Sequence, residues 1–170
     1  MVRARGVRSG RSQALRVSSI ERHVGDLLDV TTGVLVHGCN ARGVMGAGVA
    51  KAVKARYPGA YAAYRHAYDE CGLSVGQVIA YPVPNGNGSL QLVIANAIIQ
   101  ENYGTDQRQV DYAGFERAFV QVAHIARTFG FQDVHFPLIG CGLAGGNWRV
   151  IEPIIRRTLR GLRKHLWVLK

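Results

Sequence analysis

The sequence predicts an α/β sandwich, in which helices pack against a sheet of largely buried strands. Short apolar runs rich in β-branched residues alternate along the chain with segments of helical periodicity. Two of the runs, beginning at Val34 and Val134, open into glycine-rich loops that lead into helices. Two further runs flank the turn signal Pro84-Asn-Gly-Asn-Gly88, which predicts a hairpin and therefore an antiparallel element in the sheet.

Residues 1–13 and residues 14–170 differ in character. Met1 to Gln13 is rich in Arg, Gly and Ser without periodicity, and we expect a disordered basic arm there. Residues 14–170 have a length that suits one domain with a substantial core, and they contain no internal repeat.

The order of the elements follows from apolar periodicity and from the Gly and Pro residues that interrupt it. The first helix is expected to stop at Pro58-Gly59 and the second at Cys71-Gly72. Phe115, Ala118 and Phe119 begin an apolar stripe at helical spacing. The expected strands cover 14–24, 34–36, 77–83, 89–97, 134–138 and 166–169, and the expected helices cover 48–57, 60–70, 111–130 and 148–162.

Composition excludes several classes of protein. No apolar run is long enough to cross a bilayer, and the basic N-terminus lacks the apolar segment of a secretory signal. Cys39, Cys71 and Cys141 are odd in number and lack metal-binding spacing, which predicts a reducing cytoplasm and neither a disulfide framework nor a metal. No motif calls for a cofactor, and the sequence leaves the oligomeric state open.

The net charge of +10 is concentrated at the two ends of the chain. Residues 1–22 carry six arginines and residues 149–170 carry seven basic residues, whereas the stretch between them is nearly neutral. Such ends suit a polyanion such as nucleic acid, although a solvated arm and a solvated helix face are the simpler interpretation. No aromatic residues interleave with them as a base-stacking platform would require.

The two glycine loops carry the strongest indication of function. Strand, glycine loop and helix together present backbone N–H groups and a positive helix end to an anion. Either loop alone is as consistent with tight turns as with a ligand site. Both follow strands, and the pair favours one phosphate-rich ligand held between them. Cys39 and Cys141 lie within the loops as candidate thiols or, more simply, as small packing residues.

Three segments resemble the macro domain family: Gly25-Asp26-Leu27, Gly38-Cys-Asn40 with Met45-Gly-Ala-Gly-Val-Ala50, and Ile139-Gly-Cys-Gly-Leu143. The resemblance covers about residues 17–169 and is greatest to the ALC1-like and ADP-ribose-1''-phosphate phosphatase-like branch. It implies a three-layer α/β/α sandwich with a central mixed sheet. It also implies that the domain spanning 14–170 binds ADP-ribose in a cleft along the strand ends.

The resemblance further implies roles for individual residues. Asp26, with the Leu27 backbone, would contact the adenine amino group, although a helix cap or Asx turn is the alternative for Asp26. Asn40 would approach the distal ribose or, alternatively, serve as a turn residue. The remaining binding candidates surround the diphosphate and distal ribose: Met45, Gly46, Ala47, Gly48, Val49, Gly140, Cys141, Gly142, Leu143 and Ala144. Trp148 is a stacking residue or, more simply, a helix anchor.

Departures from the family pattern limit the chemistry. The strand after the hairpin, Leu92 to Gln100, lacks the Lys of related hydrolases, and Ala144 replaces the Asp that follows Gly-Cys-Gly-Leu. Asn40 and His37 remain as catalytic candidates, with a satisfied structural histidine as the alternative for His37. Four polar residues of the next loop are candidates to orient a water or to serve as loop and capping residues: Gln100, Asn102, Tyr103 and Asp111.

Three hypotheses follow. The first is hydrolysis at the distal ribose, either as an ADP-ribose-1''-phosphate phosphatase or as an ADP-ribosyl hydrolase. The second is a reader that binds ADP-ribose without turnover. The third is hydrolysis of ADP-ribose attached to nucleic acid, suggested by the basic ends.

Overall fold

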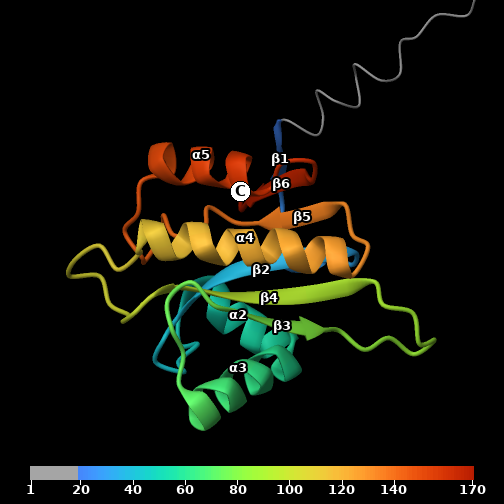
Figure 1. Cartoon of the computed structure of the whole chain (residues 1–170), viewed down its shortest axis with the longest axis horizontal. Helices are drawn as coiled ribbons and strands as arrows, with labels where there is room; N and C mark the ends of the chain where they lie inside the picture. Colours follow the sequence, from blue (N-terminus) through green and yellow to red (C-terminus); the bar gives the residue numbers. More distant parts are fainter. Residues whose placement is uncertain (1–18) are drawn as a thin grey trace, which may run out of the picture.

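The computed structural model describes residues 19–170, so the expected basic arm and residues 14–18 lie outside the described residues. The described chain forms a six-stranded sheet with the order β1-β6-β5-β2-β4-β3 (Figure 1). Neighbouring strands run parallel except β3, which pairs antiparallel with β4 as the hairpin prediction required. The strands are β1 (Ile20–Val24), β2 (Gly33–Asn40), β3 (Val78–Pro82), β4 (Leu92–Gln100), β5 (Asp133–Phe136) and β6 (Arg163–Val168).

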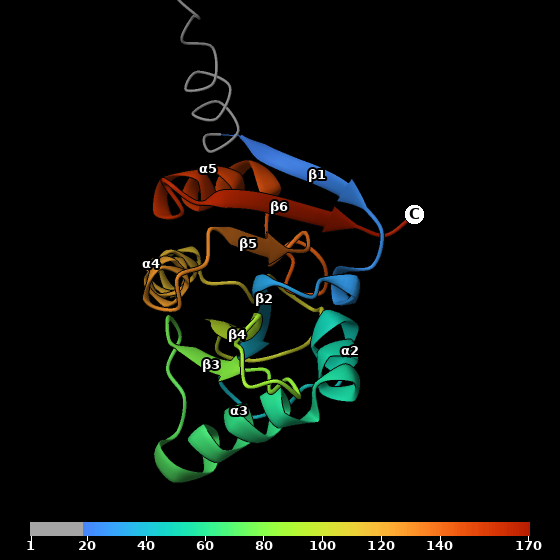
Figure 2. The same cartoon turned by 90° about the vertical axis from the view of Figure 1, so that its right-hand side faces the viewer.

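Helices cover both faces of the sheet, which confirms the predicted three-layer α/β/α architecture. Helices α2 (Gly48–Arg56) and α3 (Pro58–Cys71) lie on one face (Figure 2). Helices α4 (Tyr112–Thr128) and α5 (Trp148–Thr158) lie on the other. A 3-10 turn, η1 (Leu27–Asp29), follows β1. Within the described part of the chain, no helix is long and apolar enough to span a membrane.

The main core lies between the sheet and α4. The apolar stripe of α4 is buried as its periodicity predicted, and Phe115 stacks on Phe119 with ring centroids 4.4 Å apart. The helix begins at the capping residue Asp111, whose carboxylate accepts a hydrogen bond from the Gly114 N–H at 2.7 Å. Of the two roles expected for Asp111, the structure therefore shows the capping one.

Several predicted boundaries were wrong, among them those of β4, which covers Leu92–Gln100 and not 89–97. Helix α3 begins at Pro58, because proline suits the first helical turn, where no N–H is needed; Pro58 therefore starts α3 as well as stopping α2. Helix α5 ends at Thr158 and not at Leu162, and β6 already begins at Arg163.

A further correction affects the site. Strand β2 does not end at Val36 but continues to Asn40, because β4 pairs with it along its whole length. A register shift between Cys39 and Asn40 interrupts this pairing near its end. The residues from His37 to Asn40 thus alternate between the two faces of the sheet, as strand residues must.

Candidate functional site

A cavity of about 880 Å³ lies at the carboxyl ends of the parallel strands, where ligands bind in open α/β sheets. Four segments line it: residues 38–40 with 44 and 46–50, residues 99–100 with 103–105, residues 137–144, and residues 167–169. None of these lining residues is Asp, Glu, Lys, Arg or His. The polar surface offered to a ligand therefore consists of backbone groups and a few neutral side chains.

The two glycine loops border this one cavity. Gly46 and Gly48 line it from the loop after β2, and Gly142 and Leu143 line it from the loop after β5. The loops also approach each other, because a Cβ built on Gly48 would lie 3.5 Å from Leu143 Cδ1. The prediction that the two loops face a shared space is confirmed.

The first loop delivers the amino end of α2 to the cavity. Ala47 is the capping residue of α2 and makes no side-chain hydrogen bond to the first turn. Gly48 has φ of 55°, a left-handed conformation that glycine adopts without strain. The amides that open α2 and the positive end of its dipole are therefore available to an anion that enters the cavity.

The second loop is held by its own backbone. The Gly145 N–H donates to the Gly142 oxygen at 3.0 Å, and the Gly146 N–H donates to the Gly140 oxygen at 2.7 Å. The Cys141 N–H donates to the Leu138 oxygen, so this predicted phosphate donor is already engaged. The intervening amides of residues 142–144 remain as the candidate donors of this loop.

Asn40 lines the cavity and also organises the chain that follows it. Its Nδ2 donates to the Val44 oxygen at 2.8 Å, and its Oδ1 accepts from the Arg42 N–H at 2.9 Å. The hydroxyl of the buried Tyr64 donates to Asn40, 2.7 Å from its backbone oxygen and 2.9 Å from Oδ1. The turn role predicted as the alternative is thus present, and Asn40 stays a candidate for contact with the distal ribose.

His37 is not among the residues that line the cavity, so of its two predicted roles the catalytic one is not supported. It is fully buried, and its Nε2 lies 2.7 Å from Asn96 Oδ1. Both amide hydrogens of Asn96 are used, toward the Ala60 and Ile79 oxygens, so His37 Nε2 must be the donor. Burial lowers the pKa of His37 to about 4. The residue is a neutral, satisfied structural histidine because β2 extends further than predicted and turns this side chain toward α3.

Three predicted binding residues are not among those that line the cavity. Leu27 and Met45 are buried in the small core clusters on the α2–α3 face. Asp26 is exposed and caps η1, accepting from the Leu28 N–H at 2.9 Å, which is the capping alternative. The adjacent Gly25 N–H donates to the Val168 oxygen at 2.9 Å. Asp26 therefore lies next to the end of β6, which does line the cavity.

The two loop cysteines behave as packing residues. Cys39 is buried, and burial raises the pKa of its thiol. Burial also raises the pKa of the Cys141 thiol, although this side chain is only partly covered. Neither environment favours a thiolate, so the packing alternative is the better supported one. All three cysteines are free, in line with the expectation of no disulfides.

The loop after β4 contributes to the cavity as expected, through Tyr103 and its neighbours up to Thr105, and Gln100 lines the cavity from the end of β4 itself. Asn102 instead accepts from Arg42 Nε at 2.8 Å. Trp148 packs against the main core as the helix anchor. Sequence reasoning missed Trp167, Val168 and Leu169, which line the cavity at the end of β6. The signal was available, because the end of any parallel strand in this sheet reaches the same edge.

A model of the Macro domain family matches residues 36–155. The DNA ADP-ribosyl glycohydrolase of Mycobacterium tuberculosis is 26% identical over 128 residues, which is 75% of this chain and 35% of that protein. The ADP-ribose 1''-phosphate phosphatase of Aspergillus oryzae is 36% identical over 88 residues, which is 51% of this chain and 44% of that protein. The chain thus spans a third to a half of the length of these relatives.

Solved structures share the fold. A protein of unknown function from Bacteroides thetaiotaomicron superimposes with a TM-score of 0.77 at 27% identity, covering 89% of this chain and 98% of that one. The structure of Thermosipho africanus DarTG in complex with ADP-ribose superimposes with a TM-score of 0.73 at 21% identity. That match covers 89% of this chain and 42% of the other.

Proposed function

Because this chain belongs to the macro domain family, we propose that its cavity binds ADP-ribose and that the bound distal ribose is the site of a hydrolytic reaction. One observation carries the proposal: two loops rich in glycine, one at the amino end of α2, border a single cavity at the strand ends. Backbone donors in such an arrangement suit a diphosphate. The ADP-ribose complex of the structurally similar DarTG supports the choice of ligand.

The proposed pose places the diphosphate between the amides of 46–49 and those of 142–144. The adenosine end points toward Trp167–Leu169, where the adjacent Asp26 carboxylate accepts a hydrogen bond from the adenine amino group. The distal ribose then points toward Asn40 and the loop 103–105, which line the other part of the cavity.

The reaction we favour first is release of phosphate from ADP-ribose-1''-phosphate. Water attacks phosphorus, the bond to the ribose oxygen breaks, and ADP-ribose and inorganic phosphate leave. Among the described residues, no carboxyl or imidazole side chain lines the cavity, so the chain contributes positioning and backbone stabilisation of the developing charge. The similarity to the Aspergillus oryzae phosphatase supports this substrate.

A second candidate is removal of ADP-ribose from nucleic acid. Two observations favour it: the similarity to the Mycobacterium tuberculosis DNA ADP-ribosyl glycohydrolase, and the excess of basic residues at both ends of the chain. Binding through those residues is expected to weaken steeply with added salt.

Calorimetry with ADP-ribose, with AMP as the control ligand, tests the binding step. Saturable binding of ADP-ribose that AMP does not match supports the proposal, and absence of binding at millimolar ligand contradicts it. Release of phosphate from ADP-ribose-1''-phosphate and release of ADP-ribose from ADP-ribosylated DNA then separate the two reactions. Tight binding without turnover of either substrate identifies a reader instead of a hydrolase.

A further inference from the structure

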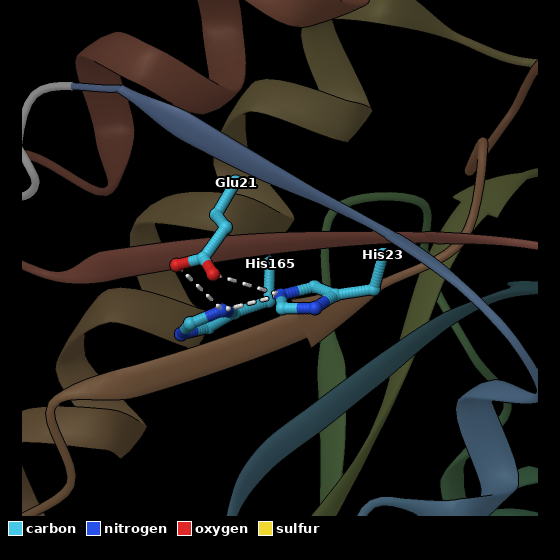
Figure 3. Close-up of side chains that lie close together, drawn as sticks. All are labelled: Glu21, His23 and His165. Atoms are coloured by element: carbon cyan, nitrogen blue, oxygen red, sulfur yellow. Dashed lines mark hydrogen bonds and ion pairs between the residues drawn. The ribbon is translucent and has the colours of Figure 1, made fainter.

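Three potential metal ligands meet on the open part of the sheet, away from the glycine loops. Glu21 and His23 are two residues apart on β1 and so point to the same face. His165 lies on β6, paired with Glu21 in the parallel register. Figure 3 shows the carboxylate and the two imidazole rings directed toward one another. Helices α2 and α3 cover the β2–β4–β3 part of this face, and in residues 19–170 no helix covers its β1–β6 part (Figure 2).

The distances suit a small ion. His23 Nε2 lies 3.0 Å from His165 Nδ1, and the Glu21 oxygens lie 3.9 Å from His23 Nε2 and 3.8 Å from His165 Nδ1. Ligand atoms of a tetrahedral zinc site are about 3.3 Å apart, given bonds of about 2.0 to 2.1 Å. The Glu21 side chain is 65% exposed, so a small rotation brings its carboxylate to that separation.

The histidine rings are already oriented. His165 Nε2 lies 2.8 Å from Asp133 Oδ1, and Asp133 is itself held by the Arg163 guanidinium at 2.6 and 2.7 Å. A carboxylate that accepts from one ring nitrogen leaves the other nitrogen free to bind a metal. Aromatic stacking adds to this, with His165 stacked on His135 at 4.5 Å and His23 stacked on Trp167 at 4.6 Å.

We infer that Glu21, His23 and His165 form a binding site for one divalent transition-metal ion of the zinc type. Two imidazoles and one carboxylate are the donor set that Zn²⁺ and Co²⁺ accept, and the exposed side leaves a fourth position for water. The ion would tie the edge strand β1 to β6. It would also fix His23 against Trp167, a residue that lines the cavity. The site is independent of the proposed ADP-ribose function.

The alternative is a hydrogen-bonded chain in which His23 donates to His165 and His165 donates to Asp133, with no metal. Zinc calorimetry on the whole chain separates the two, in a Cys71→Ser background because Cys71 is exposed. The test variants are His23→Phe, which retains the ring stacked on Trp167, and Glu21→Gln, which retains the shape of the side chain. The matched control is His124→Phe, which replaces an exposed histidine on α4.

We expect one zinc ion per chain in the background protein and in the control, and binding weaker by about tenfold or more in both test variants. Co²⁺ should give the visible absorption of a four-coordinate site in the same two proteins. Bound Co²⁺ should also quench the fluorescence of Trp167. This is measured in a Trp148→Phe variant, in which Trp167 is the single tryptophan. Circular dichroism confirms that each variant is folded. No saturable binding, or equal affinity in all variants, would overturn the inference and leave the hydrogen-bonded chain as the account of the cluster.

Discussion

Leu143, in the loop after β5, lies beside Gly48, the first residue of α2: a Cβ built on Gly48 would lie 3.5 Å from Leu143 Cδ1. Two segments almost a hundred residues apart in sequence thus meet at the proposed diphosphate position. Gly48 has a positive φ of 55°, which strains any other residue there, whereas Gly142 has no positive φ and a Cβ built on it meets no atom within 4 Å. The glycines of the two loops are therefore not equivalent, and substitutions can separate binding from folding.

Gly142→Glu should weaken binding while leaving the fold intact. Gly142 does not have a positive φ, and its Cβ position is open, so we expect the free energy of unfolding to change by less than about 0.5 kcal/mol. A carboxylate in the cavity would repel the diphosphate, and the affinity for ADP-ribose should fall by about tenfold or more. Gly142→Ala is the control and should bind nearly as the parent does. Equal affinity of Gly142→Glu and the parent in calorimetry would contradict the placement of the diphosphate.

Ligand should protect Cys141 from alkylation. Cys71 is exposed, Cys141 is partly covered at the cavity wall, and Cys39 is buried. With iodoacetamide we therefore expect Cys71 to react first, Cys141 more slowly, and Cys39 only after unfolding. Saturating ADP-ribose should slow Cys141 several-fold without affecting Cys71, which serves as the internal control in peptide mass spectrometry. If Cys141 reacts at the same rate with and without ligand, the ligand lies elsewhere.

Tyr64→Phe should destabilise the protein and weaken binding together. The buried hydroxyl donates to Asn40, and its removal leaves those acceptors less satisfied, which costs about 1 to 2 kcal/mol in the free energy of unfolding. Because Asn40 lines the cavity and holds the following turn, affinity for ADP-ribose should also fall. Urea denaturation and calorimetry measure the two effects. Tyr61→Phe, on the same helix, is the control, and a similar loss in both variants would count against a specific role for Tyr64.

His37 should make stability depend on pH in the acid range. Its pKa in the folded protein is about 4, below the value near 6.5 of an unfolded histidine, so the unfolded state binds the proton first as pH falls. The contribution of neutral His37 is complete above pH 6.5 and is lost between pH 6.5 and pH 4. Between pH 7 and pH 5 we expect a loss of about 2 kcal/mol from this residue.

The matched variant for this measurement is His37→Gln, which keeps a donor for Asn96 but does not titrate. The parent protein should lose more stability than this variant over the same pH interval in urea denaturation. Burial also lowers the pKa of His135, the other buried histidine, to about 4. Because His135 is present in both proteins, subtracting the stability loss of the variant from that of the parent removes its contribution. Parallel curves for the parent and the variant would show that the His37 pKa is not depressed.

Local patterns were sufficient for much of this molecule. Apolar periodicity and the Gly or Pro residues that end elements predicted the alternation of strands and helices, because these two signals depend only on residues close together in the chain. The two glycine loops predicted a shared cavity because parallel strands bring their carboxyl ends to one edge. The capping alternatives for Asp26 and Asp111 were also readable, since a cap involves residues only two or three positions away.

Pairing between distant strands decided the rest. How far β2 extends depends on β4, and this extension turned His37 away from the cavity and into a hydrogen bond with Asn96. His23 and His165 are 142 residues apart and meet only because β1 pairs with β6, so cysteine spacing and local motifs gave no sign of the cluster. The parallel pairing of β6 with β5 likewise brings Trp167 to the edge of the sheet where the cavity lies. A chain's own periodicity specifies which face a residue can occupy, but only the partner strand specifies which residues it meets there.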